Sequence, residues 1–123
     1  MITEIACFTY PVSDMTRARA FYEGILGLKP DSETPGEWLE YTITGGTFAI
    51  TCIAMNRQPG LKGGLIAFEV DDLDQTMAQL KAAGVPIVWE TCDTPVCRLA
   101  VVTDPDGNDV VIHKRKPCSC LTN

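Results

Sequence analysis

The chain has 123 residues, of which 46% are hydrophobic and 21% charged, and its formal net charge is −6. This length and composition predict one compact domain, residues 1–123, with its own core, and they argue against wholesale disorder. The acidic balance argues against a nucleic-acid partner, because phosphate backbones are bound by local clusters of Lys and Arg, and only Lys114, Arg115 and Lys116 form such a run.

The N-terminus and the apolar segments bear on where the protein acts. Met1-Ile2-Thr3-Glu4 lacks the basic stretch and apolar run of a secretion signal. No apolar run in the sequence approaches the roughly 18 residues that cross a bilayer. We therefore expect a cytoplasmic protein with no membrane partner.

Cysteine and histidine usage limits the metal chemistry. Cys7 and Cys52 lie in apolar, strand-like runs and are expected to be buried free thiols of a reducing compartment. The single histidine, His113, excludes a two-His-one-carboxylate iron centre or a three-His zinc site within one chain. Two further pairs could ligate a soft metal, although neither has the spacing of a zinc knuckle: Cys92 with Cys97, and Cys118 with Cys120.

The first half of the chain is predicted as β-α-β-β, with room for one more short strand near Leu28. Residues 5–12 are apolar and β-prone, and Asp14 can cap a helix whose apolar residues recur at helical spacing until Gly27. Residues 30–36 are predicted as a loop. Two strands, 37–44 and 47–55, are joined by a hairpin turn at Gly45-Gly46.

The second half repeats this order after a glycine-rich connector, residues 56–64. Residues 65–70 form the next predicted strand, and Asp72 with Gln75 three residues later predicts the start of a helix that ends before Gly84. Strands are expected over 86–90, 98–103 and 108–113, with a turn at 104–107.

The two halves align with each other. Val12-Ser13-Asp14-Met15 matches Val70-Asp71-Asp72-Leu73, and Gly27-Leu28 matches Gly84-Val85. The sequence therefore predicts two copies of one β-α-β-β-β module, at about residues 3–57 and 63–115.

Four motifs carry a resemblance to a known family, namely Pro11-Val12-Ser13-Asp14, Ala20-Phe21-Tyr22-Glu23-Gly24-Ile25-Leu26-Gly27-Leu28, Val70-Asp71-Asp72-Leu73 and Asp104-Pro105-Asp106-Gly107-Asn108. Together they resemble the vicinal oxygen chelate superfamily, which includes glyoxalase I, bleomycin resistance proteins and extradiol dioxygenases. The resemblance implies an α+β fold in which two tandem modules form a curved, half-open barrel with a ligand cavity inside and helices outside. It also implies a homodimer.

The resemblance further implies metal ligands at four strand positions. These positions fall on Cys7, near Thr51, on Leu65 and on Val111. Leucine and valine have no donor atom, so we expect no metal at the usual site and no cofactor. A displaced centre built from Glu69, His113 and Asp109 is an alternative.

A ligand pocket without metal would have a largely apolar lining with a few polar groups. His113 and Glu69 are the candidate catalytic acid and base, since histidine titrates near neutral pH and Glu69 interrupts an apolar strand. Arg98 could pair with Glu69. The predicted ligand-binding residues are Cys7, Thr9, Trp38, Thr51, Leu65, Glu69, Arg98, Val111 and His113.

These observations favour a glyoxalase/bleomycin-resistance-like protein that binds a small organic ligand without the usual metal. One alternative is a lyase, isomerase or dioxygenase with a displaced metal site or metal-free acid–base chemistry, so the sequence leaves open whether the protein is an enzyme. A further alternative is antibiotic sequestration, for which the net negative charge suits a cationic drug.

Overall fold

The computed structural model describes residues 1, 3, 6–53, 57–95 and 97–117. The predicted start of the first strand at Ile5 and two of the cysteines, Cys118 and Cys120, lie outside the described residues. The chain divides into two compact units. The first unit is Met1–Leu61 with Pro105–Asn108, and the second unit is Lys62–Asp104 with Asp109–Asn123.

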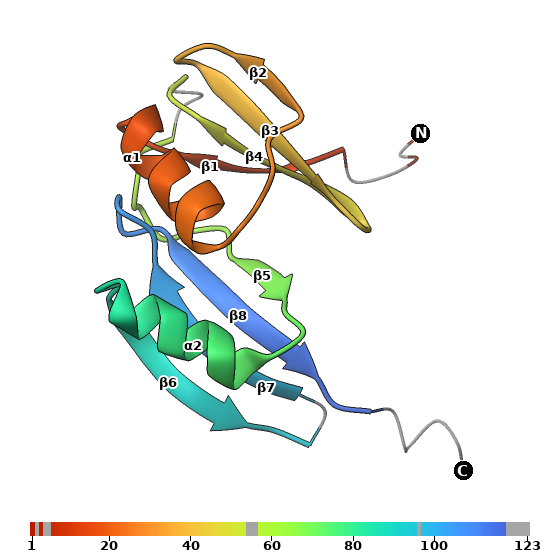
Figure 1. The fold of residues 1–123 in the computed structure, drawn as a ribbon. Helices are drawn as coiled ribbons and strands as arrows, with labels where there is room; N and C mark the ends of the chain where they lie inside the picture. Colours follow the sequence, from red (N-terminus) through yellow and green to blue (C-terminus); the bar gives the residue numbers. More distant parts are fainter. Residues whose placement is uncertain (2, 4–5, 54–56, 96, 118–123) are drawn as a thin grey trace. The chain divides into compact units, whose positions relative to one another are not determined.

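The first unit holds one four-stranded sheet and one helical segment (Figure 1). Its elements are β1 (Phe8–Pro11), α1 (Met15–Arg19), a π-helical continuation η1 (Ala20–Ile25), β2 (Ser32–Thr34), β3 (Trp38–Ile43) and β4 (Gly46–Thr51). The strand order is β1-β4-β3-β2, in which β1 and β4 are parallel and the other neighbours are antiparallel.

The second unit repeats this topology with its own four-stranded sheet. Its elements are β5 (Ile66–Glu69), α2 (Leu73–Ala82), β6 (Ile87–Asp93), β7 (Cys97–Thr103) and β8 (Asp109–Arg115). The order is β5-β8-β7-β6, again with one parallel pair, β5 and β8. The predicted α+β fold with two β-α-β-β-β modules is confirmed.

Both helices begin at the predicted aspartates. The Asp14 carboxylate accepts a hydrogen bond from the backbone N–H of Arg17 at 3.1 Å, and that of Asp72 accepts one from Gln75 at 2.9 Å. Each side chain thereby satisfies a donor that the first helical turn leaves unpaired. The π-helical geometry of η1, in which the Leu26 N–H donates to the carbonyl of Phe21 at 3.0 Å, has no counterpart in the sequence-based expectation.

The predicted loop over residues 30–36 is partly wrong, because it contains strand β2. This short strand, rather than one near Leu28, completes the first sheet. It consists of exposed Ser32, Glu33 and Thr34, so no apolar alternation marks it. The edge is held partly by Asp31, whose carboxylate accepts a hydrogen bond from the Thr42 backbone N–H at 2.9 Å.

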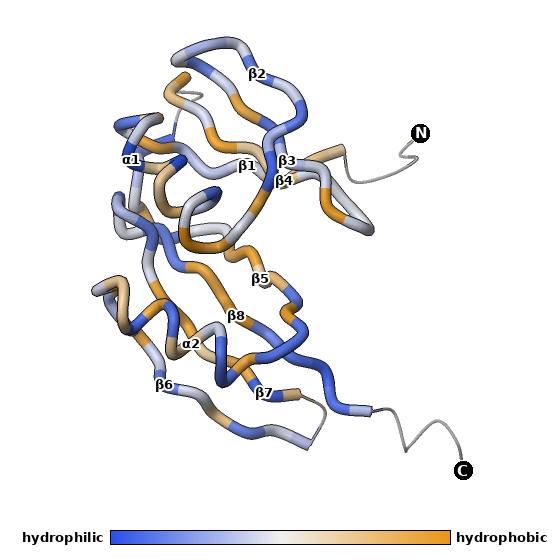
Figure 2. The backbone as a smooth tube through the Cα atoms, viewed as in Figure 1, coloured by the Kyte–Doolittle hydropathy of each residue, from blue (hydrophilic) through white to orange (hydrophobic). Residues whose placement is uncertain are grey.

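Each sheet packs one face against its own helix. In the second unit the buried residues Leu73, Met77 and Leu80 of α2 pack with fully buried Val110 and Ile112 of β8. Figure 2 shows β8 changing from hydrophobic to hydrophilic toward its end. In the first unit, a cluster of aromatic rings joins η1 to the strands, with Tyr10, Tyr22, Tyr41 and Phe48 in contact.

Strand alternation then places the other residues of each sheet on what we call its helix-free face. Because Val110 and Ile112 face α2, Val111 and His113 lie on the helix-free face of the second unit. In the first unit, Tyr10 and Phe48 face the helical segment. The helix-free face of that unit therefore carries, in register, Thr9, Pro11, Trp38, Glu40, Ala49 and Thr51.

The turn at Pro105–Asn108 is fastened to the first unit. Asp106 accepts hydrogen bonds from the Ser13 backbone at 3.1 Å, from the Ser13 hydroxyl and from the Arg17 guanidinium at 3.2 Å. The Asn108 amide donates to the carbonyl of Pro11 at 3.0 Å. The motif predicted as a simple turn therefore also anchors the segment that leads into β8.

Candidate functional site

Glu69 and His113 form a hydrogen-bonded pair on the helix-free face of the second unit. They are direct neighbours in the parallel register of β5 and β8, and 2.6 Å separates Glu69 Oε1 from His113 Nδ1. The Arg115 backbone N–H donates to the other carboxylate oxygen at 2.8 Å. The structure thus brings together the two residues predicted as an acid–base pair.

The carboxylate of this pair is held in its ionised form. Partial burial raises the pKa of Glu69, but the hydrogen bonds from the Arg115 backbone and from His113 outweigh it, and the pKa of Glu69 lies below its ordinary value. An ionised carboxylate only accepts hydrogen bonds, so the proton between the two side chains belongs to His113 Nδ1. Glu69 therefore orients the imidazole of His113 and selects its tautomer.

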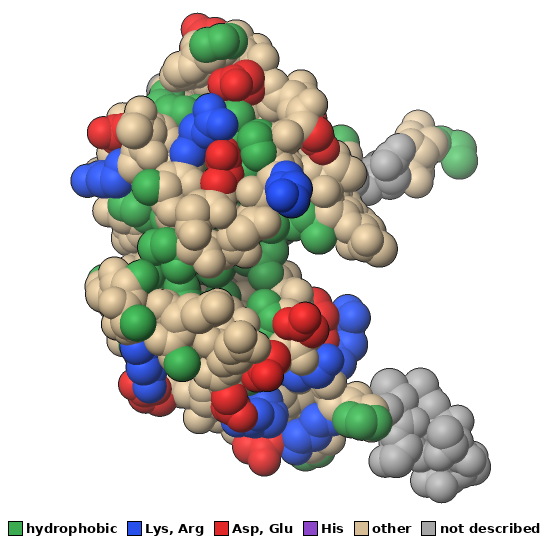
Figure 3. All heavy atoms as spheres, viewed as in Figure 1, with side chains coloured by type: hydrophobic (Ala, Val, Ile, Leu, Met, Phe, Trp, Pro, Cys, Tyr) green, Lys and Arg blue, Asp and Glu red, His purple; other side chains and the backbone are tan. Residues whose placement is uncertain are grey.

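Arg98 does not belong to this site. Its guanidinium donates to Asp74 of α2 at 2.9 Å, which lowers the pKa of Asp74. On β7, Leu99 is paired with His113, so Arg98 points to the opposite face, toward the helix. The predicted pairing of Arg98 with Glu69 is therefore wrong. Figure 3 shows acidic and basic side chains side by side on this unit.

The structure also does not assemble the alternative metal centre of Glu69, His113 and Asp109. Asp109 pairs with Lys62, with 2.6 Å between carboxylate and ammonium. It lies four residues before His113 on β8, which is about 13 Å along a strand. Among the described residues, no group of three or more His, Cys, Asp or Glu side chains could hold a metal ion.

The four metal-ligand positions implied by the family resemblance can be checked against the sheet register. Phe8 pairs with Phe48 in the first unit, and Ile66 pairs with Val110 in the second. The counterpart of Val111 is therefore Ala49, and the counterpart of His113 is Thr51. The expected position near Thr51 thus falls on Ala49, whose methyl group has no donor atom.

Thr51 itself has a structural task. It is 2% exposed, its hydroxyl donates to the carbonyl of Glu37 at 2.7 Å, and the same oxygen accepts from the Ile53 backbone N–H at 2.9 Å. Leu65 and Val111 have hydrocarbon side chains, so the Cys7 thiol is the only other donor at the expected positions. These residues do not fit the metal centre that the resemblance implies.

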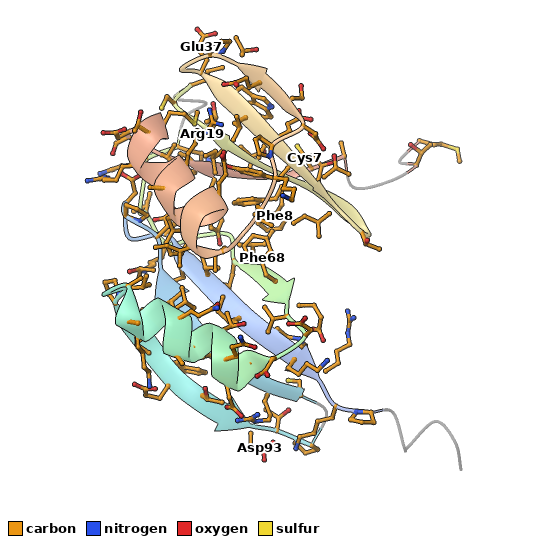
Figure 4. The ribbon with its side chains drawn as sticks, in the orientation of Figure 1. Cys7, Phe8, Arg19, Glu37, Phe68 and Asp93 are labelled. Carbon is orange, nitrogen blue, oxygen red and sulfur yellow. The ribbon has the colours of Figure 1, made fainter. Side chains whose placement is uncertain are left out.

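The helix-free face of the first unit carries an aromatic–acid pair. The indole N–H of half-buried Trp38 donates to Glu40 Oε2 at 2.8 Å. Thr9 lies in register with Ala49 on the same face, and the sulfur of half-buried Cys7 is 3.5 Å from the Thr9 hydroxyl. Figure 4 shows Cys7 at the start of β1. Sequence reasoning missed Glu40, which the two-residue spacing from Trp38 could have revealed.

A second polar network in the first unit also escaped the sequence-based predictions. The hydroxyl of fully buried Tyr41 donates to Glu23 Oε2 at 3.0 Å, and Arg19 Nε donates to the same oxygen at 2.7 Å. Burial and the hydrogen bond to Glu23 raise the pKa of Tyr41 well above its ordinary value. The labelled Arg19 in Figure 4 marks this network, which lies on the helix side of the sheet and stabilises the fold.

The described cysteines, Cys7, Cys52, Cys92 and Cys97, are all free thiols. Cys52 is exposed and Cys7 is half-buried, so the expectation of two buried thiols is wrong for Cys52 and met only in part by Cys7. Cys52 follows the last residue of β4, where the chain leaves the sheet and its apolar neighbours no longer cover it.

Of the helices in the described part of the chain, none has the length and apolar character needed to span a bilayer.

The family model for the Glyoxalase/Bleomycin resistance protein/Dioxygenase superfamily matches residues 4–112. Together with the two β-α-β-β-β units, this shows that the chain belongs to that superfamily.

Solved structures of similar proteins agree. TnmS3, an antibiotic binding protein from Streptomyces sp. CB03234, is 29% identical with a TM-score of 0.79, covering 94% of this chain and 98% of that one. A glyoxalase/bleomycin resistance protein from the same organism is 31% identical with a TM-score of 0.73, covering 93% and 100%.

A curated relative is CFP32 of Mycobacterium bovis, which carries a provisional glyoxylase name. It is 33% identical over 103 residues, which are 81% of this chain and 40% of that protein. The chain thus spans less than half the length of this relative.

Proposed function

We propose that the protein binds a small organic molecule and does so without the metal centre of the superfamily's enzymes. The observation that carries this proposal is the donor set at the expected ligand positions. Ala49, Leu65 and Val111 have no donor atom, and the hydroxyl of Thr51 is occupied by Glu37 and Ile53. The likeness to an antibiotic binding protein supports binding rather than metal-dependent turnover.

The ligand contacts are assigned to the helix-free faces of the two sheets. In the first unit they include the predicted residues Cys7, Thr9 and Trp38. Glu40, which accepts the hydrogen bond of Trp38, joins this set. In the second unit they include Leu65, Glu69, Val111 and His113. Thr51 contributes methyl surface rather than a free hydroxyl. The family resemblance implies a homodimer, and sedimentation equilibrium measures that assembly.

Metal analysis tests the first half of the proposal. Protein purified without chelator is expected to contain far less than one equivalent of nickel, zinc, iron or manganese by mass spectrometry. Adding each metal is expected to leave the Tm unchanged, whereas a metal at a hundred times its Kd would stabilise the protein by about 2.7 kcal/mol. A stoichiometric metal contradicts the proposal. A metal-dependent Tm rise that Cys7→Ser abolishes also contradicts it, because Cys7 is the remaining donor at the expected ligand positions.

Antibiotic sequestration is the second candidate, and the similarity to TnmS3 favours it. The formal charge of −6 and the Trp38–Glu40 pair suit a cationic, planar drug, because cations are attracted by both carboxylates and indole faces. Calorimetric titration with bleomycin is expected to show saturable heat that Trp38→Ala reduces. A titration without heat removes this candidate and leaves metal-free binding of another ligand to be tested.

A further inference from the structure

We propose that the Glu69–His113 pair recognises a ligand through an acidic hydroxyl group, a phenol or enol, with His113 Nε2 as the hydrogen-bond and proton acceptor. This inference rests on the proposed function, since it names the ligand chemistry of that binding protein. Three points carry it: the His113 tautomer that Glu69 selects, the exposure of Nε2, and the hydrocarbon side chains that lie beside the pair.

The tautomer follows from the arrangement around Glu69. Both carboxylate oxygens are occupied by donors, Oε2 by the Arg115 backbone N–H at 2.8 Å and Oε1 by His113 Nδ1 at 2.6 Å. The backbone donor is fixed by the strand, so Glu69 has one orientation. An imidazole that carries its single proton on Nδ1 presents a lone pair at Nε2.

Nε2 is free and reachable. The structure forms no hydrogen bond to it from any described residue. Every buried side-chain nitrogen or oxygen in the described, non-exposed residues has a hydrogen-bond partner. An Nε2 without a partner is therefore not buried, in agreement with a His113 side chain that is 25% exposed. A ligand approaching this face meets an acceptor that water otherwise satisfies.

The surroundings favour a hydroxyl carried by an apolar body. On the same face, Leu99 is in register with His113, and Ala67 and Val101 are both in register with Val111. The exposed Arg115, two residues after His113 on β8, is also on this face, and its charge helps to lower the pKa of Glu69. These hydrocarbon side chains suit an aromatic or enolic ring better than an ion, because burying an unpaired charge against them would be costly. His113 Nε2, a single hydrogen-bond acceptor, then favours those apolar molecules that carry a hydroxyl group able to donate a hydrogen bond.

The proton transfer balances within the pair and the ligand. As the O–H bond breaks, its electron pair stays on the ligand oxygen and an N–H bond forms at Nε2. The resulting imidazolium is stabilised by the Glu69 carboxylate, to which Nδ1 continues to donate. No metal or other co-reactant is needed. Ligand release returns the proton to the oxygen.

Nitrogen-15 NMR tests the tautomer directly, because His113 is the single histidine of the chain and its two ring signals need no assignment among several residues. Wild-type protein is expected to show Nδ1 protonated and Nε2 unprotonated. In Glu69→Gln the amide oxygen can accept from Arg115, which turns the amide NH₂ toward Nδ1. The protonated nitrogen should therefore become Nε2, and an unchanged tautomer overturns the proposed role of Glu69.

Two probes of nearly the same shape test the recognition. 4-Nitrophenol carries the acidic hydroxyl, and 4-nitroanisole has a methyl ether in its place. Wild-type protein is expected to bind the phenol about tenfold more tightly, as one hydrogen bond lost from a buried partner implies, and the absorption of bound phenol should shift toward that of the phenolate. Both effects should be lost in His113→Phe and in Glu69→Gln.

Lys114→Gln is the matched control, because Lys114 is in register with Arg98 and therefore lies on the helix side of the same strand. It should bind both probes as the wild type does. Equal affinity of wild-type protein for the two probes, or binding of neither, overturns the inference. Neither result changes the measured metal content. Failure of this inference can therefore be distinguished from failure of the proposal that the protein binds its ligand without a metal.

Discussion

The side-chain carbonyl of Asn108 accepts a hydrogen bond from the backbone N–H of Gly60 at 2.9 Å. The amide group of the same residue donates to the carbonyl of Pro11 at 3.0 Å. Asn108 is 6% exposed, and it joins three segments of the first unit that are far apart in sequence. Loss of this side chain would leave the half-buried Gly60 N–H and Pro11 carbonyl without these hydrogen bonds, which is costly.

Asn108→Ala should therefore lower the free energy of unfolding by about 2–4 kcal/mol, since each orphaned buried group costs about 1–3 kcal/mol. Urea denaturation measures the loss. Asn108→Asp keeps the acceptor for Gly60 but puts a carboxylate against the Pro11 carbonyl, so it should also destabilise. A loss below about 0.5 kcal/mol for both variants, the range of ordinary surface changes, would refute this role.

Gly60 should not tolerate a side chain. Its φ is +76°, and a Cβ there would lie 2.1 Å from the Asp106 carbonyl oxygen. Gly60→Ala is expected to destabilise the protein by more than about 2 kcal/mol, because the left-handed backbone alone costs about 1–2 kcal/mol. Gly63→Ala, where nothing lies within 4 Å and the backbone is not left-handed, is the matched control and should be nearly neutral. Equal thermal stability of the two variants would contradict the model of this contact.

Tyr41→Phe tests the network on the helix side of the first sheet. Losing the hydrogen bond to the charged Glu23 should cost about 2 kcal/mol. Since the pKa of Tyr41 is raised in the folded protein, the unfolded chain ionises first above the ordinary tyrosine value of about 10. The stability advantage of the wild type over Tyr41→Phe should therefore shrink as the pH rises above 10, and an advantage that grows there would show the opposite sign.

Glu69 should make the free energy of unfolding depend on pH in the acidic range. Because its pKa is lowered on folding, its contribution is complete above the ordinary glutamate value of about 4.3 and is lost as the pH falls through the folded-state pKa. The stability difference between wild type and Glu69→Gln should shrink between pH 6 and pH 3 in denaturation experiments. In a His113→Phe background the pH dependence should be weaker, since one of the donors to the carboxylate is gone. An unchanged pH dependence in that background would assign the shift to Arg115 alone.

Local signals predicted much of the fold. Asp14 and Asp72 are short side chains that satisfy donors within one helical turn, so they can be recognised without knowing the rest of the structure. Strand β2 could not be predicted, because its exposed residues carry no apolar alternation and its place is set by pairing with β3.

The candidate site was predictable only in part. Glu69 and His113 each stood out by residue type, but their contact depends on the register of two strands that are distant in sequence. Arg98 was assigned to the wrong face because the pairing of β7 with β8 decides which alternate residues of β7 face the helix. The composition of β7 alone does not show this. Tyr41 and Glu23 gave no local signal, since their hydrogen bond spans separate elements.

The equivalence of Thr51 and His113 suggests how the repeated module has diverged. At one place in the shared topology, the first copy carries a hydroxyl that closes the end of its own strand. The second copy carries the imidazole of His113, whose Nε2 makes no hydrogen bond to a described residue and is accessible to a ligand. In a duplicated unit, one copy can keep a structural residue at a position where the other copy has a residue able to bind a ligand. Thr51→His would therefore remove the hydrogen bonds at the end of β4 and destabilise that strand end before it could create a second site.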